Sequence, residues 1–210
     1  MAFTPARFAA LRPVLYHTTR AENLAAIRAD GVLKSAAEVR GGPAEGDQPR
    51  GGWVPIVRGG RTTFLCDQKP LHLAAVDWEP GWDGPRWLRR LDELVFLWPG
   101  AEDGPIAYGW RHRAVYRRAH EAGALKSVTL AVPTADLFAA NPGREPLFCK
   151  YNSGAPTFRA RSPRGGSTFV PAGDAPFTAG AVKECVFERS VALPPSTRVL
   201  TGDDDAPLFD

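Results

Sequence analysis

The sequence has few of the residues that cross-link small proteins or bind metals. Its 210 residues include three cysteines, Cys66, Cys149 and Cys185, which lie far apart and form no CxxC pair. This spacing excludes a cysteine-based zinc site and provides no disulfide framework. We therefore expect a reducing, cytoplasmic setting and no bound metal.

Long apolar runs are also missing. No stretch approaches the roughly 18 apolar residues that a membrane-spanning helix needs, so we expect no membrane partner. Near the N-terminus, Arg7 and Arg12 interrupt the apolar segment that a secretory signal requires. The net charge is only +3, which permits a nucleic-acid partner without requiring one.

The composition favours one globular domain. An apolar fraction of 44% is enough for a sizeable core, and 20 prolines with 21 glycines favour loops and short strands over a helical bundle. We expect a single domain over residues 1–210. Within it we expect an N-terminal arm at residues 1–13, a long loop at residues 36–60 and an acidic tail at residues 201–210.

Apolar runs and alternating patterns predict several short strands. They fall at residues 14–16, 61–66, 94–98, 127–132, 147–151, 168–170 and 182–191. Helical spacing predicts helices after Thr19 and at residues 71–76, 85–91, 106–122 and 134–140. The longest should turn Tyr108, Val115 and Ala119 inward. Together these elements predict an α+β fold, with a mixed or antiparallel sheet and short helices on the outside.

The stretch from Leu15 to Leu33 carries the clearest motif. A strand ends at His17 and is followed at once by a helix, for which Thr19 to Glu22 fits a capping box. Gly31 then supplies the left-handed residue that ends the helix. A histidine thus lies where a strand meets the positive end of a helix, which suits a polar or anionic ligand. A purely structural histidine is the competing interpretation.

This opening resembles that of bacterial DNA ADP-ribosyltransferase toxins of the DarT type. More broadly, it is similar to the histidine-bearing, poly-ADP-ribose-polymerase-like branch of the ADP-ribosyltransferase superfamily. The matching residues are Tyr16, His17, Thr18, Thr19, Asn23, Leu24, Ile27 and Gly31–Leu33. The superfamily's late motif, a glutamate opening an alternating strand, matches Glu184. Asp67–Leu71, Val95–Pro99 and Tyr151–Ala155 also resemble an uncharacterised bacterial family of unknown function.

The resemblance implies a split-sheet ADP-ribosyltransferase fold with NAD as substrate and no metal. Glu184 would stabilise the positive charge that develops on the ribose when nicotinamide leaves, and His17 would orient NAD. Residues that would contact NAD are Tyr16, His17, Thr18, Thr19, Asn23, Arg61 and Phe64. Arg61 and Phe64 match by order along the chain and not by a distinctive string. Glu188 is the rival carboxylate on the same strand face.

Several arginines are candidates for contacting the acceptor substrate. Arg111 and Arg113 lie on the longest predicted helix, and Arg159, Arg161 and Arg164 lie in a late loop. The competing interpretation is a solvated helix face and an ordinary polar loop. Aromatic residues beside the helix arginines, including Trp110, could stack on nucleic-acid bases.

The sequence therefore predicts an NAD-dependent ADP-ribosyltransferase that modifies nucleic acid or protein. By the resemblance it would be a bacterial toxin or defence effector with an antitoxin partner. The alternatives are an NAD hydrolase and a non-catalytic module that binds NAD or nucleic acid. Removal of an RNA 2′-phosphate uses the same fold, but the group that performs it has early motifs richer in arginine than this sequence.

Overall fold

The computed structural model describes residues 3–42, 49–66, 68, 71–123, 126–153, 163–201 and 204–209. The remaining residues include Arg159 and Arg161 and parts of the stretches at 67–71 and 151–155, so those predictions lie outside the described chain. No described helix is long and apolar enough to cross a bilayer.

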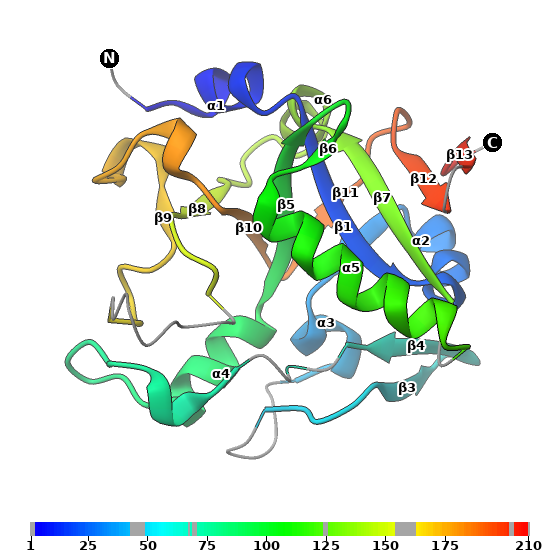
Figure 1. Cartoon of the computed structure of the whole chain (residues 1–210), viewed down its shortest axis with the longest axis horizontal. Coiled ribbons are helices and arrows are strands. Elements are labelled where there is room, and N and C mark those ends of the chain that lie inside the picture. The colour runs from blue at the N-terminus through cyan, green and yellow to red at the C-terminus, as the bar shows by residue number, and fades with distance from the viewer. Residues whose placement is uncertain are drawn as a thin grey trace.

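The fold is built around a nine-stranded sheet, shown in Figure 1. Its order is β13-β12-β7-β1-β5-β10-β8-β9, and β6 pairs with β5 beside this path. The strands are β1 (Val14–Arg20), β5 (Leu94–Ala101), β6 (Gly104–Pro105), β7 (Ser127–Pro133), β8 (Leu147–Cys149), β9 (Val170–Pro171), β10 (Glu184–Glu188), β12 (Arg198–Thr201) and β13 (Asp204–Pro207). Each pairing between these strands is antiparallel, which confirms the α+β prediction and selects the antiparallel alternative.

Two small sheets flank this large one. In the first, β2 (Val32–Lys34) pairs with β11 (Ser190–Ala192). In the second, β3 (Val54–Arg58) and β4 (Arg61–Leu65) form a hairpin closed by Gly59 and Gly60. Both glycines have positive φ, 57° and 76°, as a two-residue hairpin turn of type I′ requires. The expected strand at 61–66 is thus confirmed, with its partner inside the expected loop at 36–60.

Ten short helices surround the sheets in the described residues. They are α1 (Pro5–Leu11), η1 (Ala21–Asn23), α2 (Leu24–Asp30), α3 (Ala36–Arg40), η2 (Leu73–Ala75), α4 (Gly84–Asp92), α5 (Ala107–Glu121), α6 (Thr134–Ala139), η3 (Ala172–Asp174) and η4 (Ala179–Ala181). The longest, α5, lies across the face of β1, β5 and β7 (Figure 1). Its contacts cover Tyr16 and Trp98, whereas Leu15 and Leu130 face the main core.

The large sheet divides along β5. Residues Trp98–Gly100 of β5 pair with Val14–Tyr16 of β1 on one side. Residues Leu94–Leu97 pair with Cys185–Glu188 of β10 on the other side. Because β1 and β10 use different halves of the same strand, β1 leaves β5 after Tyr16 and the sheet opens there.

Several local predictions were wrong. In the N-terminal arm, the described residues 3–13 include α1, which buries Phe8 completely in the main core. The acidic tail includes β13, which pairs with β12, and Leu208 beyond it is buried. The expected helix at 71–76 is only the single turn η2. Val115 is 52% exposed, because α5 instead turns Gly109 and Tyr116 inward.

The capping box after β1 was also wrong. Thr19 still belongs to β1, and η1 begins without a side-chain cap. The Thr19 hydroxyl instead accepts a hydrogen bond from Asn23 at 2.9 Å. The predicted end of the following helix is confirmed, since Gly31 has φ 66° and its N–H donates to the Ile27 carbonyl.

Candidate functional site

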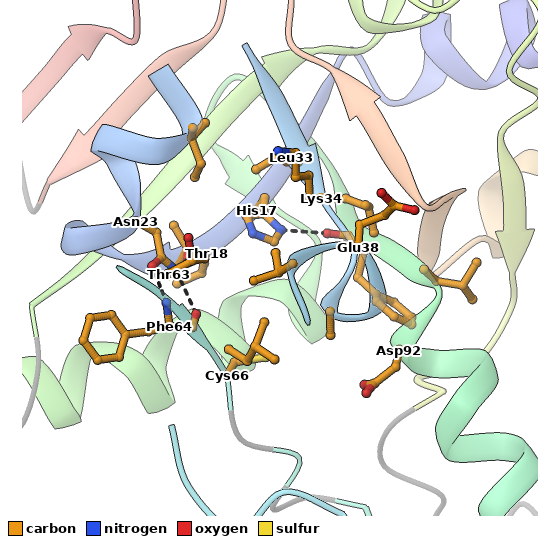
Figure 2. A pocket seen from close by; sticks show the side chains of 18 of the residues that line it. His17, Thr18, Asn23, Leu33, Lys34, Glu38, Thr63, Phe64, Cys66 and Asp92 are labelled. Atoms are coloured by element: carbon orange, nitrogen blue, oxygen red, sulfur yellow. Dashed lines mark hydrogen bonds between the residues drawn. The ribbon is translucent and has the colours of Figure 1, made fainter. Parts of the chain in front are cut away.

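A pocket of about 610 Å³ opens where β1 leaves β5. Its walls come from β1, α2, the β3–β4 hairpin, α5 and the start of β10, and Figure 2 shows part of it. Most of the site residues predicted from sequence line it, namely His17, Thr18, Thr19, Asn23, Arg61, Phe64 and Glu184. The fold thus brings the early histidine and the late glutamate to one cavity, of a size typical for small-molecule sites.

The imidazole of His17 has one nitrogen committed to the protein. Its Nδ1 lies 2.9 Å from the backbone oxygen of Phe96 (Figure 2). A carbonyl can only accept, so Nδ1 carries the hydrogen. Burial lowers the pKa of His17 below its usual value, although the bond to Phe96 opposes this shift. The ring is therefore neutral near pH 7, with Nε2 as an acceptor for a ligand hydroxyl or N–H.

Glu184 begins β10 opposite Cys149 of β8 and is only 2% exposed. Its Oε1 accepts a hydrogen bond from the Ser153 backbone N–H at 3.1 Å. No hydrogen-bond partner for the buried Oε2 is found among the described residues. Burial raises the pKa of this carboxyl to about 7, and the Ser153 hydrogen bonds and the charge of Arg164 act in the opposite direction. A buried carboxylate with a spare acceptor atom is well suited to a ligand hydroxyl.

Thr19 and Asn23 line the pocket but use their polar atoms within the protein. The Asn23 amide donates to Thr19 Oγ1 at 2.9 Å and to the Phe64 carbonyl at 2.9 Å. Its Oδ1 accepts from the Phe64 backbone N–H at 2.8 Å, and Figure 2 shows both bonds to Phe64. These two residues hold the hairpin in place, which sequence reasoning did not anticipate.

Phe64 and Arg61 form part of the hairpin wall. The guanidinium of Arg20 lies 4.3 Å from the centre of the Phe64 ring, so one ring face is occupied. Arg61 is ion-paired with Asp30 at 3.0 Å, and its side chain is 56% exposed. Both residues line the pocket, although Figure 2 shows the ring of Phe64 turned away from His17.

The remaining predicted residues do not line the pocket. The Tyr16 hydroxyl donates to the Ala101 carbonyl, and burial, reinforced by the nearby Glu102 charge, raises its pKa to about 12. Arg111 and Arg113 lie over the rings of Tyr108 and Trp110 on α5.

Arg164 is only 3% exposed and lies 4.6 Å from the Tyr151 ring centre, with a bond to the Asn152 carbonyl. It was predicted as a loop residue for substrate phosphate. The structure instead buries it behind the segment that contacts Glu184.

Sequence reasoning missed an aromatic wall contributed by β5 and α5. Ring centres lie 5.4 Å apart for Trp98 and His112, 4.8 Å for His112 and Tyr116, and 5.6 Å for Tyr116 and Trp53. All four residues line the pocket. Burial, with a smaller contribution from His17, lowers the pKa of His112 to about 4. The four-residue spacing of His112 and Tyr116 on a predicted helix was the available signal.

A second missed feature is the buried carboxylate Asp92 at the end of α4. It accepts hydrogen bonds from Arg50 at 2.6 and 2.8 Å, from Arg40 at 2.7 Å and from Gln68 at 3.3 Å. Arg50 and Gln68 line the pocket beside it. Two arginines on one carboxylate leave this wall with a net positive charge, which suits an anionic group.

Among the described residues, no group of three or more His, Cys, Asp or Glu side chains could hold a metal ion. One family model matches residues 13–193. The chain belongs to DUF7002, a family of unknown function. No curated protein matches it, and no solved structure does. The residues that line the pocket, from His17 to Glu184, all lie within the matched segment.

Proposed function

We propose that this DUF7002 protein is an NAD-dependent ADP-ribosyltransferase with the corresponding split-sheet fold. The observation that carries the proposal is the meeting of His17 and Glu184 in one pocket at the opening of the sheet. These are the two residues on which the resemblance to the ADP-ribosyltransferase superfamily depends. They come from opposite ends of the chain and from strands on opposite sides of β5.

The chemistry required of Glu184 fits its surroundings. Loss of nicotinamide builds positive charge on the ribose, and a carboxylate in a water-poor site stabilises that charge far better than one in water. Glu184 is buried and keeps Oε2 available for a ribose hydroxyl. The nicotinamide ring of NAD is itself cationic, so bound NAD would favour the ionised carboxylate.

His17 and the arginine-bearing walls would position NAD. The Nε2 atom of His17 would accept a hydrogen bond from a ribose hydroxyl, while its Nδ1 donates to the Phe96 carbonyl. Asp92 with its two arginines, Arg40 and Arg50, carries a net positive charge and would face the diphosphate. We place the protein in the cytoplasm, where NAD is available and cysteines without a disulfide stay reduced.

The direct test uses labelled NAD with wild-type protein and with Glu184→Gln. Transfer of label to nucleic acid or protein by the wild type, reduced at least about 100-fold in the variant, would support the proposal. Release of free ADP-ribose without labelled acceptor would indicate the NAD hydrolase alternative. Glu188→Gln is the matched control, because Glu188 lies on the same strand but is exposed and paired with Arg90 at 2.8 Å. Equal NAD consumption and equal labelling by wild type and Glu184→Gln would exclude the proposed role of Glu184.

The solvent face of α5 favours nucleic acid as the acceptor or as a bound partner. Arg111, Arg117 and Arg118 are exposed, and Trp110 is 45% exposed beside Arg113. Cationic side chains next to an accessible aromatic ring suit a nucleic-acid strand. Binding that weakens steeply with added salt, and that weakens further in Arg117→Gln/Arg118→Gln, would support this role. A toxin or defence role with an antitoxin stays a prediction of the resemblance.

A further inference from the structure

We propose that Asn23 is a positioning residue that docks the β3–β4 hairpin against the end of β1 and thereby closes the pocket. The hairpin contributes about a fifth of the pocket-lining residues, including Ile56, Arg58, Arg61, Thr63 and Phe64. It belongs to neither of the other sheets. The completeness of the pocket therefore depends on how firmly this hairpin is held.

The hairpin has little packing of its own. Val57 is 69% exposed and Val54 is 37% exposed, and within the hairpin only Leu65 is buried. A two-stranded hairpin is at best marginally stable in water without support from other elements. Its position must come from contacts with its neighbours, chiefly η1 and α2.

Asn23 provides those contacts in the way that a neighbouring strand would. Phe64 lies opposite Pro55 in the hairpin, and its N–H and C=O both point outward to the Asn23 amide. Pro55 has no N–H to donate, so this pair suits a position without ladder bonds between the two strands. The Phe64 N–H can only donate and its carbonyl can only accept, which fixes the orientation of the amide. Asn23 is 5% exposed, so water competes little for these bonds.

Other contacts between the hairpin and its surroundings are more exposed. Arg20 lies between the rings of Phe64 and Trp53, at 4.3 and 5.5 Å from their centres. The Arg61–Asp30 ion pair lies at the surface, where such pairs contribute little. Among the described polar contacts of the hairpin, the buried amide is therefore expected to contribute most to docking, alongside the burial of Leu65.

Hydrogen–deuterium exchange of the whole protein tests the docking role without any ligand. In Asn23→Ala, and in Asn23→Asp, which loses the donor, exchange across residues 54–65 should rise about tenfold. Exchange in β1, β5 and β7 should stay at the wild-type rate. Asp30→Asn is the control and should leave the hairpin within about twofold of wild type. If the hairpin exchanged at the wild-type rate in both Asn23 variants, the docking role would be overturned.

The positioning of a ligand is the second part of the test, and it rests on the proposed function. Asn23→Ala should raise the KM for NAD about tenfold and leave kcat within about threefold, because the closed pocket still forms but is less populated. A fall in kcat at unchanged KM would indicate ordinary destabilisation and would overturn the positioning role. Arg20→Gln removes the cation packed on the Phe64 ring and should show a smaller rise in KM, which makes it a control for the Asn23 variants. If the wild-type protein neither binds nor consumes NAD, the proposed function fails. Hydrogen–deuterium exchange still decides the docking role in that case.

Discussion

The side chain of His17 reaches the backbone of Phe96 at the point where the backbones of β1 and β5 separate. The ladder between these strands ends at Tyr16 and Trp98, one residue before the histidine. The imidazole thus donates a hydrogen bond to the Phe96 carbonyl, beyond the last paired residues of β1 and β5. The same ring lines the pocket. A structural bond and a ligand-facing atom are combined in one side chain.

We predict that His17→Ala weakens NAD binding by about tenfold or more. The change removes the Nε2 acceptor and leaves the Phe96 carbonyl without its partner in the pocket wall. Isothermal titration calorimetry with NAD measures the effect. His72→Ala is the control, since His72 is exposed and lies outside the pocket lining. If wild type and His17→Ala bound NAD with equal affinity, His17 would not be part of the NAD-binding site.

The rate of transfer should depend on the ionisation of Glu184. The pKa of this carboxyl is raised to about 7, and only the charged form stabilises a cationic ribose. Therefore kcat/KM should rise tenfold per pH unit below about 7 and level off above it. Burial lowers the pKa of His17 below its usual value, so its ring is neutral at and above pH 7. A flat profile between pH 5.5 and 8.5 would argue against Glu184 as the essential carboxylate.

The ionisation of Glu184 should also change the free energy of unfolding. Here a rise in pH has the opposite effect, because it lowers stability while it raises the rate. Between the unfolded pKa near 4.5 and the folded value near 7, the folded protein holds the proton more tightly. The contribution of Glu184 to stability is therefore greatest at low pH and is lost as pH rises to about 7. Glu184→Gln should remove this dependence and be more stable than wild type at pH 8, by up to about 3 kcal/mol. Urea unfolding at pH 5 and pH 8 measures the difference; a variant that is less stable at pH 8 would contradict it.

The N-terminal helix should be essential for stability. Phe8 is fully buried, and its ring centre lies 4.8 Å from that of Phe148. Phe8→Ala should lower the free energy of unfolding by about 3–5 kcal/mol, because it leaves a cavity in the main core. Denaturant unfolding checks this value. The exposed Leu11 of the same helix provides the control, since Leu11→Ala should cost well under half as much.

The elements that could be predicted from sequence are those with strong local signals. The run from Leu94 to Trp98 and the alternation around Glu184 gave correct strands, and Gly31 gave a correct helix end. The hairpin was only half predicted, although Gly59 and Gly60 between two short apolar runs are a direct signal for it. The surrounding glycines and prolines concealed that signal.

Site residues could be predicted where the residue type itself determines the chemistry. They could not be predicted where the role depends on tertiary packing. His17 and Glu184 were named from their motifs, and both line the pocket. The roles of Thr19 and Asn23 could not be predicted, because they depend on a hairpin about forty residues later along the chain. Arg164 looked like a solvent-exposed loop residue, and only the fold reveals that it is buried.

The continuous backbone of β5 fixes the distance between the two halves of the pocket. Its first half carries the wall that begins at Glu184, and its second half carries the wall that ends at His17. One continuous strand connects these walls, so they cannot slide past each other as two packed elements could. A ligand that touches both therefore meets a fixed span, while the hairpin and α5 can change in sequence around it. Divergence of specificity within the family would then be expected at the rim, with the span preserved.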